Sequence, residues 1–560
     1  MRFIPGKYLL IVLLSCCLAF TANAQNSLKE EVPKGWHLKD KQSDGYYGIS
    51  LEKAYDFVRS KNLKSKPVIV ADIDSGIDTT HEDLKPILWK NPGEIPGNGI
   101  DDDKNGYVDD VNGWNFIGGK DGKNVEQGSY EAARVYHKLK SKWESKTVDE
   151  SQLSKSEKDE YEMWKKSETE IAGNSNSSGL ELIFLKRAYH AAMKSDSILR
   201  KAMGKEKYTG ADLDKFTSDD AEVKKSKLTM MNLFQEGDAM ENNNQDFLEE
   251  FGDYMRGEED KANAAETPPK DFRAEIVKDN YNDFNDRFYG NNNVMVSNKS
   301  ALHGTHVSGI IAAIRNNGIG MDGIADNVKI MMIRAIPDGD EYDKDIALAI
   351  RYAVDNGARV INMSFGKSFS PEKKWVDDAV KYAESKDVLL VHAAGNDSKN
   401  IDEEWYFPSP VFIEDGKRAN NWITVGASGD PKTGGLVTGF SNYGKNEVDV
   451  FAPGIKIYST LPGENNYGNL QGTSFASPVV AGLAAFIIEY FPQLSAKQVK
   501  MAIEKSAQNP GIKVTKPGTE DEVDLSEISR SGGIINAYDA IKLAATMKGE
   551  RKVTPEKKGF

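Results

Sequence analysis

A serine lies among small residues at the start of a long apolar stretch. The segment 472–478 reads GTSFASP and contains Ser474, and an apolar run follows over 479–488. We expect a buried helix that begins at or just before Ser474, with Pro478 in its first turn, where the missing N–H breaks no helical bond. The first N–H groups of a helix have no intrahelical partner, so this end could stabilise an oxyanion. To act as a nucleophile, Ser474 also needs a base, a group that orients the base and a second oxyanion donor.

A histidine and an aspartate of the required kind occur earlier in the chain. His303 lies in the sequence LHGTHVSG, where small residues open an apolar helix expected over 305–314. Asp74 follows a run rich in Val and Ile over 67–73, which is typical of a buried parallel strand. The ends of such strands are where open α/β sheets place their sites. Asp72 is the competing carboxylate, but an aspartate inside an apolar strand is expected to be a structural residue with hydrogen-bond partners.

Together, these three motifs resemble those of the subtilase family of serine proteases. Their order along the chain, Asp74 then His303 then Ser474, is the order in subtilisin. The resemblance covers about residues 45–118 and 299–545. It implies that Ser474 attacks the scissile carbonyl, that His303 takes its proton and returns it to the leaving amine, and that Asp74 orients the imidazole.

The resemblance also implies an oxyanion donor and a substrate cleft. Asn396 follows a strand expected over 388–392, so its amide would be held on a rigid element beside the Ser474 N–H. Two short segments would form the walls of the primary specificity pocket. The backbone of the segment 364–366 could pair with an extended substrate strand. These walls are Ala393, Ala394 and Gly395 on one side, and Ser364, Phe365 and Gly366 on the other.

Three features near these motifs have more than one interpretation. His306 lies one turn beyond His303 and is expected to be a packed structural imidazole, because no third zinc ligand of suitable spacing accompanies it. His392 is expected to be a core histidine bonded to backbone, with a pocket modifier as the alternative. The segment 406–408 resembles the pocket floor but leads into an unfamiliar stretch, so the sequence does not predict the side-chain preference.

A second group of polar residues has the spacing of a calcium loop. The predicted ligands are the side chains of Asp101, Asp103, Asn105 and Asp109 and the backbone carbonyl of Tyr107. The loop departs from the EF-hand pattern, because Asn112 stands where a bidentate Glu would close the ligand shell. We favour a structural calcium ion over a solvated acidic turn, because carboxylates packed this closely repel one another unless a cation neutralises them.

Residues 316–320, which read NNGIG, resemble the other calcium loop of the family. Asp83 would be a partner carboxylate in this loop. The alternative for Asn-Asn-Gly is a helix C-cap. The sequence leaves these two interpretations open.

The rest of the sequence predicts the elements that must position these residues. Apolar strands and amphipathic helices alternate, which is typical of a three-layer α/β/α fold with a doubly wound, mostly parallel sheet, as in subtilisin. The expected elements are helix 51–59, helix 305–314, strand 328–333, helix 343–355, strand 359–363, helix 372–385, strand 388–392, strand 422–425, helix 495–506 and helix 535–545.

A large charged segment interrupts this alternation. Residues 120–298 are rich in Lys and Glu and show apolar residues at helical spacing, so we expect a helical insertion. The catalytic domain would then comprise residues 25–119 and 299–547, followed by a basic, disordered tail over 548–560. The insertion separates two motifs that must meet in the folded site, and we expect a lid that restricts substrate entry. A side domain that docks a partner or the cell surface is the alternative.

The N-terminus and the composition indicate export. Residues 1–24 form a basic start, a short apolar run and an A-x-A site, which together predict a cleaved signal peptide. A lipid anchor at Cys16 is the less favoured alternative. The only cysteines, Cys16 and Cys17, lie in this segment, so the cleaved chain would contain no disulfide. The net charge of −14 disfavours nucleic acid and suits cations.

These observations predict an exported, calcium-stabilised, subtilisin-like serine endopeptidase that acts on proteins or peptides. We expect it in the periplasm or secreted, with no membrane-spanning segment; the sequence does not predict its oligomeric state. One alternative is a catalytically silent scaffold, which would normally have lost one of Asp74, His303, Asn396 and Ser474. Another is a processing protease that its insertion restricts to one partner.

Overall fold

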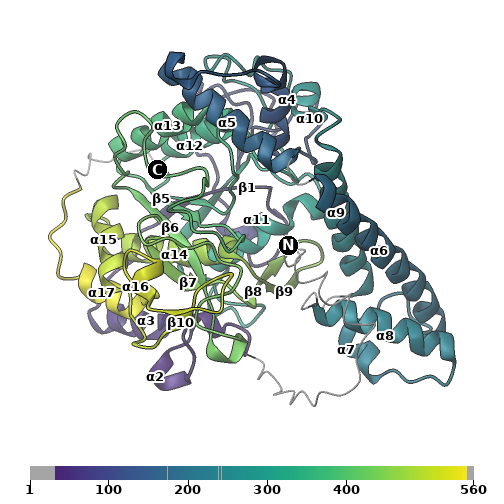
Figure 1. The fold of residues 1–560 in the computed structure, drawn as a ribbon. Coiled ribbons are helices and arrows are strands. Elements are labelled where there is room, and N and C mark those ends of the chain that lie inside the picture. The colour runs from purple at the N-terminus through teal and green to yellow at the C-terminus, as the bar shows by residue number, and fades with distance from the viewer. Residues whose placement is uncertain (1–31, 173–174, 237–238, 241–242, 552–560) are drawn as a thin grey trace. The chain divides into compact units, whose positions relative to one another are not determined.

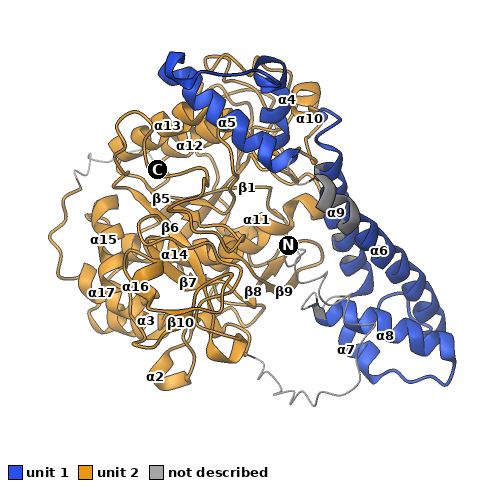
Figure 2. Cartoon of the chain, in the orientation of Figure 1, with its two compact units in different colours: residues 1–26, 132–270 blue, residues 27–131, 271–560 orange. Residues whose placement is uncertain are grey.

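The computed structural model describes residues 32–172, 175–236, 239–240 and 243–551. The signal peptide predicted over residues 1–24, with Cys16, lies outside the described residues. The described chain divides into two compact units (Figure 2). Ala132–Lys270 form the helical unit, and the described residues up to Glu131 and from Asp271 onward form the sheet unit.

The sheet unit is built on a seven-stranded sheet with the order β2-β3-β1-β4-β5-β6-β7 (Figure 1). Every neighbouring pair of strands in it is parallel. Asp74, at the end of β1, is paired in register with Arg334 at the end of β3. The strands are β1 (Val68–Asp74), β2 (Gly113–Asn115), β3 (Val328–Arg334), β4 (Val360–Met363), β5 (Leu389–Ala393), β6 (Trp422–Ser428) and β7 (Val450–Pro453).

Helices cover both faces of this sheet, because successive strand residues point to opposite faces and both sets are apolar. Val70 and Val391 pack in one buried cluster, whereas Ala71 and Leu390 pack in another. The first cluster includes α3 (Leu51–Ser60), α11 (Asn298–Ala312), α14 (Thr473–Tyr490), α15 (Ala496–Ser506) and α17 (Ala537–Ala544), and the second includes α12 (Asp343–Asp355) and α13 (Lys373–Ser385). The predicted three-layer α/β/α fold is confirmed.

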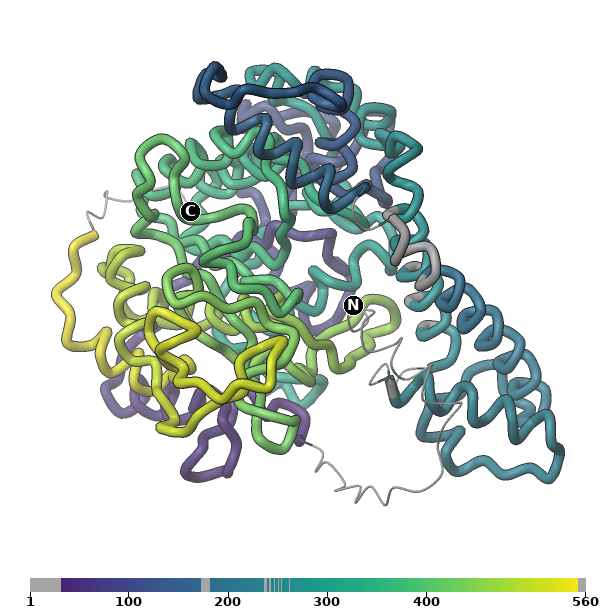
Figure 3. Tube along the Cα trace, viewed as in Figure 1, coloured from purple at the N-terminus to yellow at the C-terminus, as the bar shows by residue number. Residues whose placement is uncertain are grey.

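α14 is the central helix of the first layer. Among the described residues, it is the helix long and apolar enough, by length and composition, to cross a membrane, yet 89% of it is buried. Segments distant in sequence also meet on this side: α3, purple in Figure 3, lies beside α17, in yellow. The Ala537 N–H donates to the Ile49 carbonyl at 2.7 Å.

Several smaller elements complete the sheet unit. They are α2 (Lys41–Asp44), α10 (Phe272–Val277), α16 (Leu525–Ile528), the hairpin of β8 (Ile457–Leu461) and β9 (Asn466–Leu470), the hairpin of β10 (Val514–Thr515) and β11 (Glu522–Val523), and three 3₁₀ turns at Trp36–Leu38, Lys85–Ile87 and Pro431–Thr433.

The helical unit has a hydrophobic core of its own. Its buried side chains include Leu199, Leu213, Phe234, Phe247 and Phe251. The helices are α4 (Glu131–Trp143), whose first residue belongs to the sheet unit, α5 (Lys155–Ile171), α6 (Ser175–Met203), α7 (Gly210–Lys215), α8 (Ala221–Glu236) and α9 (Asn244–Asn263), with a 3₁₀ turn at Glu150–Gln152. A separate core is the usual mark of a domain.

The helical unit, Ala132–Lys270, spans fewer residues than the insertion expected over 120–298. Residues on both sides of it are held by hydrogen bonds within the sheet unit: Arg334 Nη2 donates to the Val125 carbonyl at 2.6 Å, and Trp114 Nε1 donates to the Tyr289 carbonyl at 2.8 Å. The sequence did not predict these contacts, because the flanking residues are as charged as the insertion and their partners are distant in the chain.

The start predicted for the disordered tail, residue 548, is also too early in the sequence. Gln498 Nε2 donates to the Lys548 carbonyl at 2.8 Å, and the Arg551 N–H donates to the Gln493 carbonyl at 3.1 Å. Arg551 also forms an ion pair with Asp387 at 3.2 Å. The chain therefore stays attached to the sheet unit up to Arg551, and residues 552–560 lie outside the described residues.

Candidate active site

Asp74 at the end of β1 and His303 in α11 form a hydrogen-bonded pair. His303 Nδ1 lies 2.8 Å from Asp74 Oδ1 and 2.9 Å from Oδ2. A carboxylate accepts hydrogen bonds, so Nδ1 is the donor of this pair, and Nε2 presents a lone pair when the ring is neutral. The Asp74 side chain is 2% exposed and the His303 side chain 32% exposed. The geometry is therefore that of a partly exposed base held by a buried acid.

α11 begins earlier than the sequence predicted. It starts at Asn298 instead of at residue 305, because Ser297 caps it: Ser297 Oγ accepts from the Ser300 N–H at 3.1 Å. His303 therefore lies in the second turn of the helix. Gly304 permits the close approach to β1, since a Cβ at this position would lie 2.3 Å from the Gly76 carbonyl oxygen.

Asp72, two residues before Asp74, is fully buried and has partners for its carboxyl group. Ser308 Oγ donates to Oδ2 at 2.8 Å, and Asn362 Nδ2 donates to Oδ1 at 3.1 Å. Burial raises the pKa of Asp72 well above its usual range, and the nearby Asp74 charge adds to this effect. These contacts agree with the structural interpretation of Asp72.

Ser474 is the second residue of α14, so its N–H belongs to the first helical turn, where N–H groups lack intrahelical partners. Its Oγ donates to the Ser364 carbonyl at 3.1 Å, and Ser364 Oγ donates to the Ser474 carbonyl at 2.7 Å. The placement of Pro478 in the first turn was wrong, because α14 begins at Thr473 and Pro478 falls in the second turn. Its missing N–H is the one that would have bonded to the Ser474 carbonyl.

α11, which carries His303, packs against α14, which carries Ser474. The His303 ring packs against Phe475, the residue after Ser474, with ring centroids 5.3 Å apart. Within the part of the chain that the structure describes, the hydrogen bond of Ser474 Oγ runs to Ser364 and not to His303. Hydrogen bonds between a nucleophile and its base are often loose before a substrate binds.

Asn396 is fixed to the start of α14 by Thr473. The Thr473 N–H donates to Asn396 Oδ1 at 2.8 Å, and Thr473 Oγ1 lies 3.0 Å from the same oxygen. Because a backbone N–H can only donate, the amide oxygen faces Thr473 and the NH2 group points away from this contact. The Gly395 N–H donates to Thr473 Oγ1 at 3.0 Å. Sequence reasoning missed this role of Thr473, although it is next to Ser474.

Asn442 holds the loop around Asn396 from a distant position in the sequence. Its Nδ2 donates to the Ala394 carbonyl at 2.9 Å, and its Oδ1 accepts from the N–H groups of Asp397 and Lys399 at 3.0 and 2.9 Å. Asn442 is fully buried. No motif marks it in the sequence, because its partners are backbone groups about 45 residues away.

The two segments expected to form pocket walls follow neighbouring strands. Residues 364–366 follow β4, and Ala393 ends β5, with residues 394–395 directly after it. His392 is buried and its Nε2 lies 2.8 Å from the Phe365 carbonyl, as expected for a core histidine bonded to backbone. Burial lowers its pKa to about 3, so the ring is neutral and links the two walls.

His306 likewise behaves as a packed imidazole. It is fully buried, its Nε2 lies 3.2 Å from the Gly468 carbonyl, and its ring packs against Phe475 with centroids 4.7 Å apart. Burial lowers its pKa to about 3. The neutral ring helps to join α11, α14 and the β8–β9 hairpin beneath His303.

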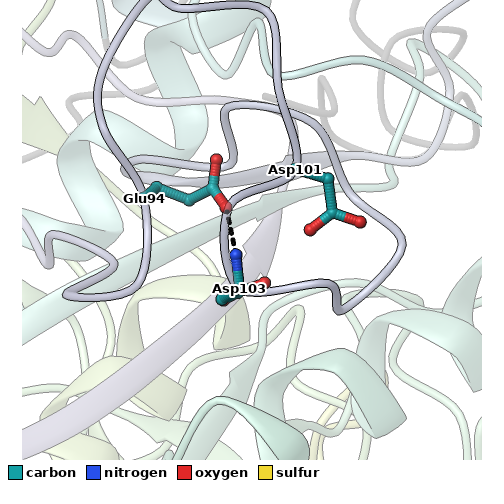
Figure 4. A group of neighbouring side chains, drawn as sticks. All are labelled: Glu94, Asp101 and Asp103. Carbon is teal, nitrogen blue, oxygen red and sulfur yellow. Dashed lines mark hydrogen bonds between the residues drawn. The ribbon is translucent and has the colours of Figure 1, made fainter.

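The acidic loop after β1 brings three carboxylates together (Figure 4). One oxygen each from Glu94, Asp101 and Asp103 lies within 4.8 Å of the others. Glu94 Oε1 accepts from the Asp102 and Asp103 N–H groups at 2.9 and 3.2 Å, so it shapes the loop. Carboxylate oxygens retain lone pairs beyond such bonds, and a set of this charge suits a hard cation. Sequence reasoning missed Glu94 because it precedes the loop motif.

Asn105 and Tyr107, two other predicted ligands, maintain the conformation of this loop. Asn105 Nδ2 donates to Asp103 Oδ2 at 3.1 Å, and Asn105 Oδ1 accepts from the Tyr107 N–H at 2.8 Å. The Tyr107 ring is buried against Trp114, with centroids 5.0 Å apart. Tyr107 thereby anchors the loop on the second hydrophobic cluster.

The Asp109 carboxylate lies outside the group formed by Glu94, Asp101 and Asp103. Its Oδ1 accepts from the N–H groups of Gly97 and Asn98 at 2.7 and 3.2 Å, and its Oδ2 accepts from Gly99 at 2.8 Å. Its carboxylate therefore faces the turn at 97–99 and does not join the carboxylate cluster. Glu94 takes its place among the candidate ligands.

The loop at 316–320 lies against Asp83, whose two carboxylate oxygens both accept hydrogen bonds. Asn317 Nδ2 donates to Asp83 Oδ1, and Tyr467 Oη donates to Asp83 Oδ2 at 2.8 Å. The alternative of a helix C-cap at these residues is wrong, because the C-cap of α11 is Ala313.

Comparisons with known proteins show which family this chain resembles. The model of the subtilase family matches residues 65–527. The thermophilic serine proteinase of Bacillus sp. (strain AK1) is 39% identical over 240 residues, which are 43% of this chain and 52% of that protein. Subtilisin DY of Bacillus licheniformis is 38% identical over 212 residues, which are 37% of this chain and 71% of that protein.

A protease from Pseudoalteromonas arctica is 31% identical, covers 43% of this chain and 70% of its own, and has a TM-score of 0.35. This chain spans about half the length of the thermophilic proteinase that it matches. The family match extends over more than half of the present chain. The chain therefore belongs to the subtilase family.

Proposed function

We propose that the chain is an exported serine endopeptidase that hydrolyses peptide bonds of an extended protein or peptide substrate. The observation that carries this proposal is the Asp74–His303 pair, with Nδ1 bonded to the carboxylate at 2.8 Å, next to the helix end that bears Ser474. The pair leaves Nε2 as a base on the exposed side of the ring. A silent scaffold would have no need of an aspartate that orients this ring.

In the proposed reaction, His303 Nε2 takes the proton of Ser474 Oγ while Oγ bonds to the scissile carbonyl carbon. The carbonyl oxygen becomes an oxyanion, and His303 then gives the proton to the leaving amine as the C–N bond breaks. A water molecule repeats these steps on the acyl-enzyme, which releases the second product and restores Ser474. Asp74 holds the imidazole and stabilises its charge throughout.

The oxyanion would lie between the Ser474 N–H and the Asn396 NH2 group. Support comes from the bonds that anchor the Asn396 oxygen on Thr473, because they leave the NH2 group as the donor that faces away. Donors fixed before the reaction need no reorganisation as charge develops, which is the main source of such stabilisation.

We also infer a structural calcium ion at Glu94, Asp101 and Asp103. One oxygen from each of these three carboxylates lies within 4.8 Å of the others, and carboxylate oxygens are the donors that Ca²⁺ prefers. Bound calcium would cancel their mutual repulsion and so stabilise the folded loop.

Export to the periplasm or outside the cell rests on the leader-like sequence of residues 1–24, with cleavage before Gln25 favoured over a lipid anchor at Cys16. Immunoblotting of cell fractions, with mass spectrometry of the mature N-terminus, tests this point. A full-length cytoplasmic product would contradict it.

A fluorophosphonate probe tests the catalytic proposal directly. We expect covalent labelling of Ser474 in the wild type, with no label in Ser474→Ala and strongly reduced label in His303→Gln. Circular dichroism of the variants should show the wild-type fold, because the Ser474 hydroxyl is not needed for core packing. Casein hydrolysis by Ser474→Ala at the wild-type rate, or labelling of another serine, would refute the mechanism.

A further inference from the structure

The phenol ring of Tyr406 lies between the two walls of the expected specificity pocket. A Cβ built on Gly366 would lie 2.3 Å from Tyr406 Oη and 2.4 Å from Cζ. A Cβ built on Gly395 would lie 2.7 Å from both Cε2 and Cζ of the same ring. One wall thus contacts the end of the ring and the other contacts its side, and both walls have a glycine at the point of contact.

Backbone hydrogen bonds hold Tyr406 in this position. The Lys367 N–H donates to the Phe407 carbonyl at 2.9 Å, and the Phe407 N–H donates to the Lys367 carbonyl at 2.8 Å. The residue after Tyr406 is therefore paired with the residue after Gly366, so the segment that carries the ring is tied to one wall.

Buried side chains support the ring from below. The His392 ring lies against Tyr406, with centroids 5.7 Å apart, and against Trp422, with centroids 5.2 Å apart. Since His392 is itself bonded to the Phe365 carbonyl at 2.8 Å, the support and the wall form one packed group. A rotation of Tyr406 toward the sheet would require this group to move.

We propose that Tyr406 restricts the primary specificity pocket, so that the enzyme cleaves after glycine, alanine or serine and discriminates against large side chains. The inference rests on the proposed function and specifies its substrate class. A large aromatic or aliphatic side chain needs the space between the walls, which the phenol ring already fills at van der Waals contact. A methyl or hydroxymethyl group needs only the mouth of the pocket.

Peptide p-nitroanilides that differ only in the residue before the scissile bond test this proposal. We expect the wild type to hydrolyse the alanine substrate with a kcat/KM at least about tenfold above that of the phenylalanine substrate. Tyr406→Gly should raise kcat/KM for the phenylalanine substrate at least about tenfold and so lower the ratio of alanine to phenylalanine hydrolysis. Tyr406→Phe is the matched control: it keeps the ring, and therefore the preference for alanine.

A second measurement tests the position of the ring without relying on activity. Gly366→Ala should lower the melting temperature, because the new Cβ would overlap Tyr406 Oη. In a Tyr406→Gly background the same change should cost little, so the two substitutions should be strongly non-additive. Additive effects would overturn the assigned position of Tyr406.

The outcomes distinguish the specificity from the catalytic proposal. An enzyme whose Ser474 is labelled by fluorophosphonate, but which hydrolyses both substrates equally, overturns the role of Tyr406 alone. An unchanged ratio in an active Tyr406→Gly variant does the same. Absence of both labelling and hydrolysis of any peptide would instead refute the proposed function.

Discussion

Ser364 Oγ donates a hydrogen bond to the Ser474 carbonyl at 2.7 Å, in the place of the helical bond that Pro478 cannot donate. Asn362 Nδ2 in turn donates to Ser364 Oγ at 3.0 Å and to Asp72 Oδ1 at 3.1 Å. These contacts link β1, β4 and the start of α14 through buried polar groups. The position of Ser474 therefore depends on the strand that precedes the pocket wall as well as on its own helix.

Ser364→Ala should destabilise the protein by about 1 kcal/mol, because it leaves the partly buried Ser474 carbonyl without its partner. Urea unfolding measures this cost. Ser364→Thr retains a hydroxyl and should recover most of the loss. Equal unfolding midpoints for Ser364→Ala and the wild type would show that this hydrogen bond does not support α14.

Asn396→Ala should lower kcat by about 10²–10³-fold with little change in KM, the usual loss for one oxyanion donor. Steady-state kinetics on one peptide substrate measures the two parameters separately. An effect confined to KM would contradict a role in the transition state.

Thr473→Val should produce a smaller kcat defect, because the Thr473 N–H still holds Asn396 Oδ1 after the hydroxyl is lost. Thr473→Ser restores the bonds to Asn396 and Gly395 and should recover the wild-type rate. If serine did not rescue the valine variant, the defect would come from packing instead of from the position of Asn396.

The alternation of elements was predictable because each has a strong periodic pattern. The apolar spacing of residues 343–355 predicted α12 with the bounds seen in the structure, and the Val- and Ile-rich runs predicted β1, β3 and β5. The residues of the Asp74–His303 pair could be found because their motifs are short and local.

The remaining features depend on contacts that no local pattern encodes. Tyr406 reaches Gly366 and Gly395, and Asn442 reaches the loop of Asn396, through tertiary packing. The early start of α11 had a local signal, the Ser297 cap, but it lies in charged sequence that resembled the insertion. Asp109 has calcium-loop spacing, yet three backbone N–H groups of a preceding turn bind its carboxylate.

Stability should fall as the pH rises from about 4.5 to about 8, through Glu341. Burial raises the pKa of this carboxyl from 4.5 to about 8, against the opposing effect of Lys367. The folded protein thus keeps a proton that the unfolded chain releases above about pH 4.5. The contribution is fully present below that pH and is lost toward pH 8, by up to about 1.4 kcal/mol per pH unit.

Glu341→Gln should remove this part of the pH dependence, because glutamine carries no titrating proton. Urea unfolding between pH 5 and 8 compares it with the wild type, and Glu520→Gln, at an exposed position, is the matched control. Parallel curves for all three proteins would show that Glu341 does not titrate in this range.

Removal of calcium should lower the melting temperature, since a metal that binds only the folded loop stabilises it by mass action. Glu94→Gln and Asp103→Asn should each reduce the number of bound calcium ions by one in titration calorimetry. Asp102→Asn is the matched control: its carboxylate binds the Ile95 N–H at 3.0 Å and lies outside the cluster. Unchanged stoichiometry in the first two variants would contradict the site.

The role of the insertion can be tested because its two ends are attached close together on the sheet unit. The Glu131 N–H donates to Asp340 Oδ2 at 2.8 Å, and Tyr342 Oη donates to Asp271 Oδ1 at 3.5 Å. Glu131 Oε2 also pairs with Lys367 Nζ at 2.8 Å, directly after the wall residue Gly366. The two residues that flank the helical unit, Glu131 and Asp271, are therefore held within the sheet unit.

Replacing Ala132–Lys270 by a short Gly/Ser linker decides between a lid and a docking domain. The deletion should leave the sheet unit folded, because the helical unit has its own core and the anchoring residues on either side remain. A lid predicts faster cleavage of folded proteins with small-peptide turnover largely kept, since only large substrates are held back. A docking domain predicts the wild-type ratio of the two rates. A stably folded deletion variant with that unchanged ratio would exclude the lid. The next measurement would then be binding of the isolated helical unit to a partner or to the cell surface.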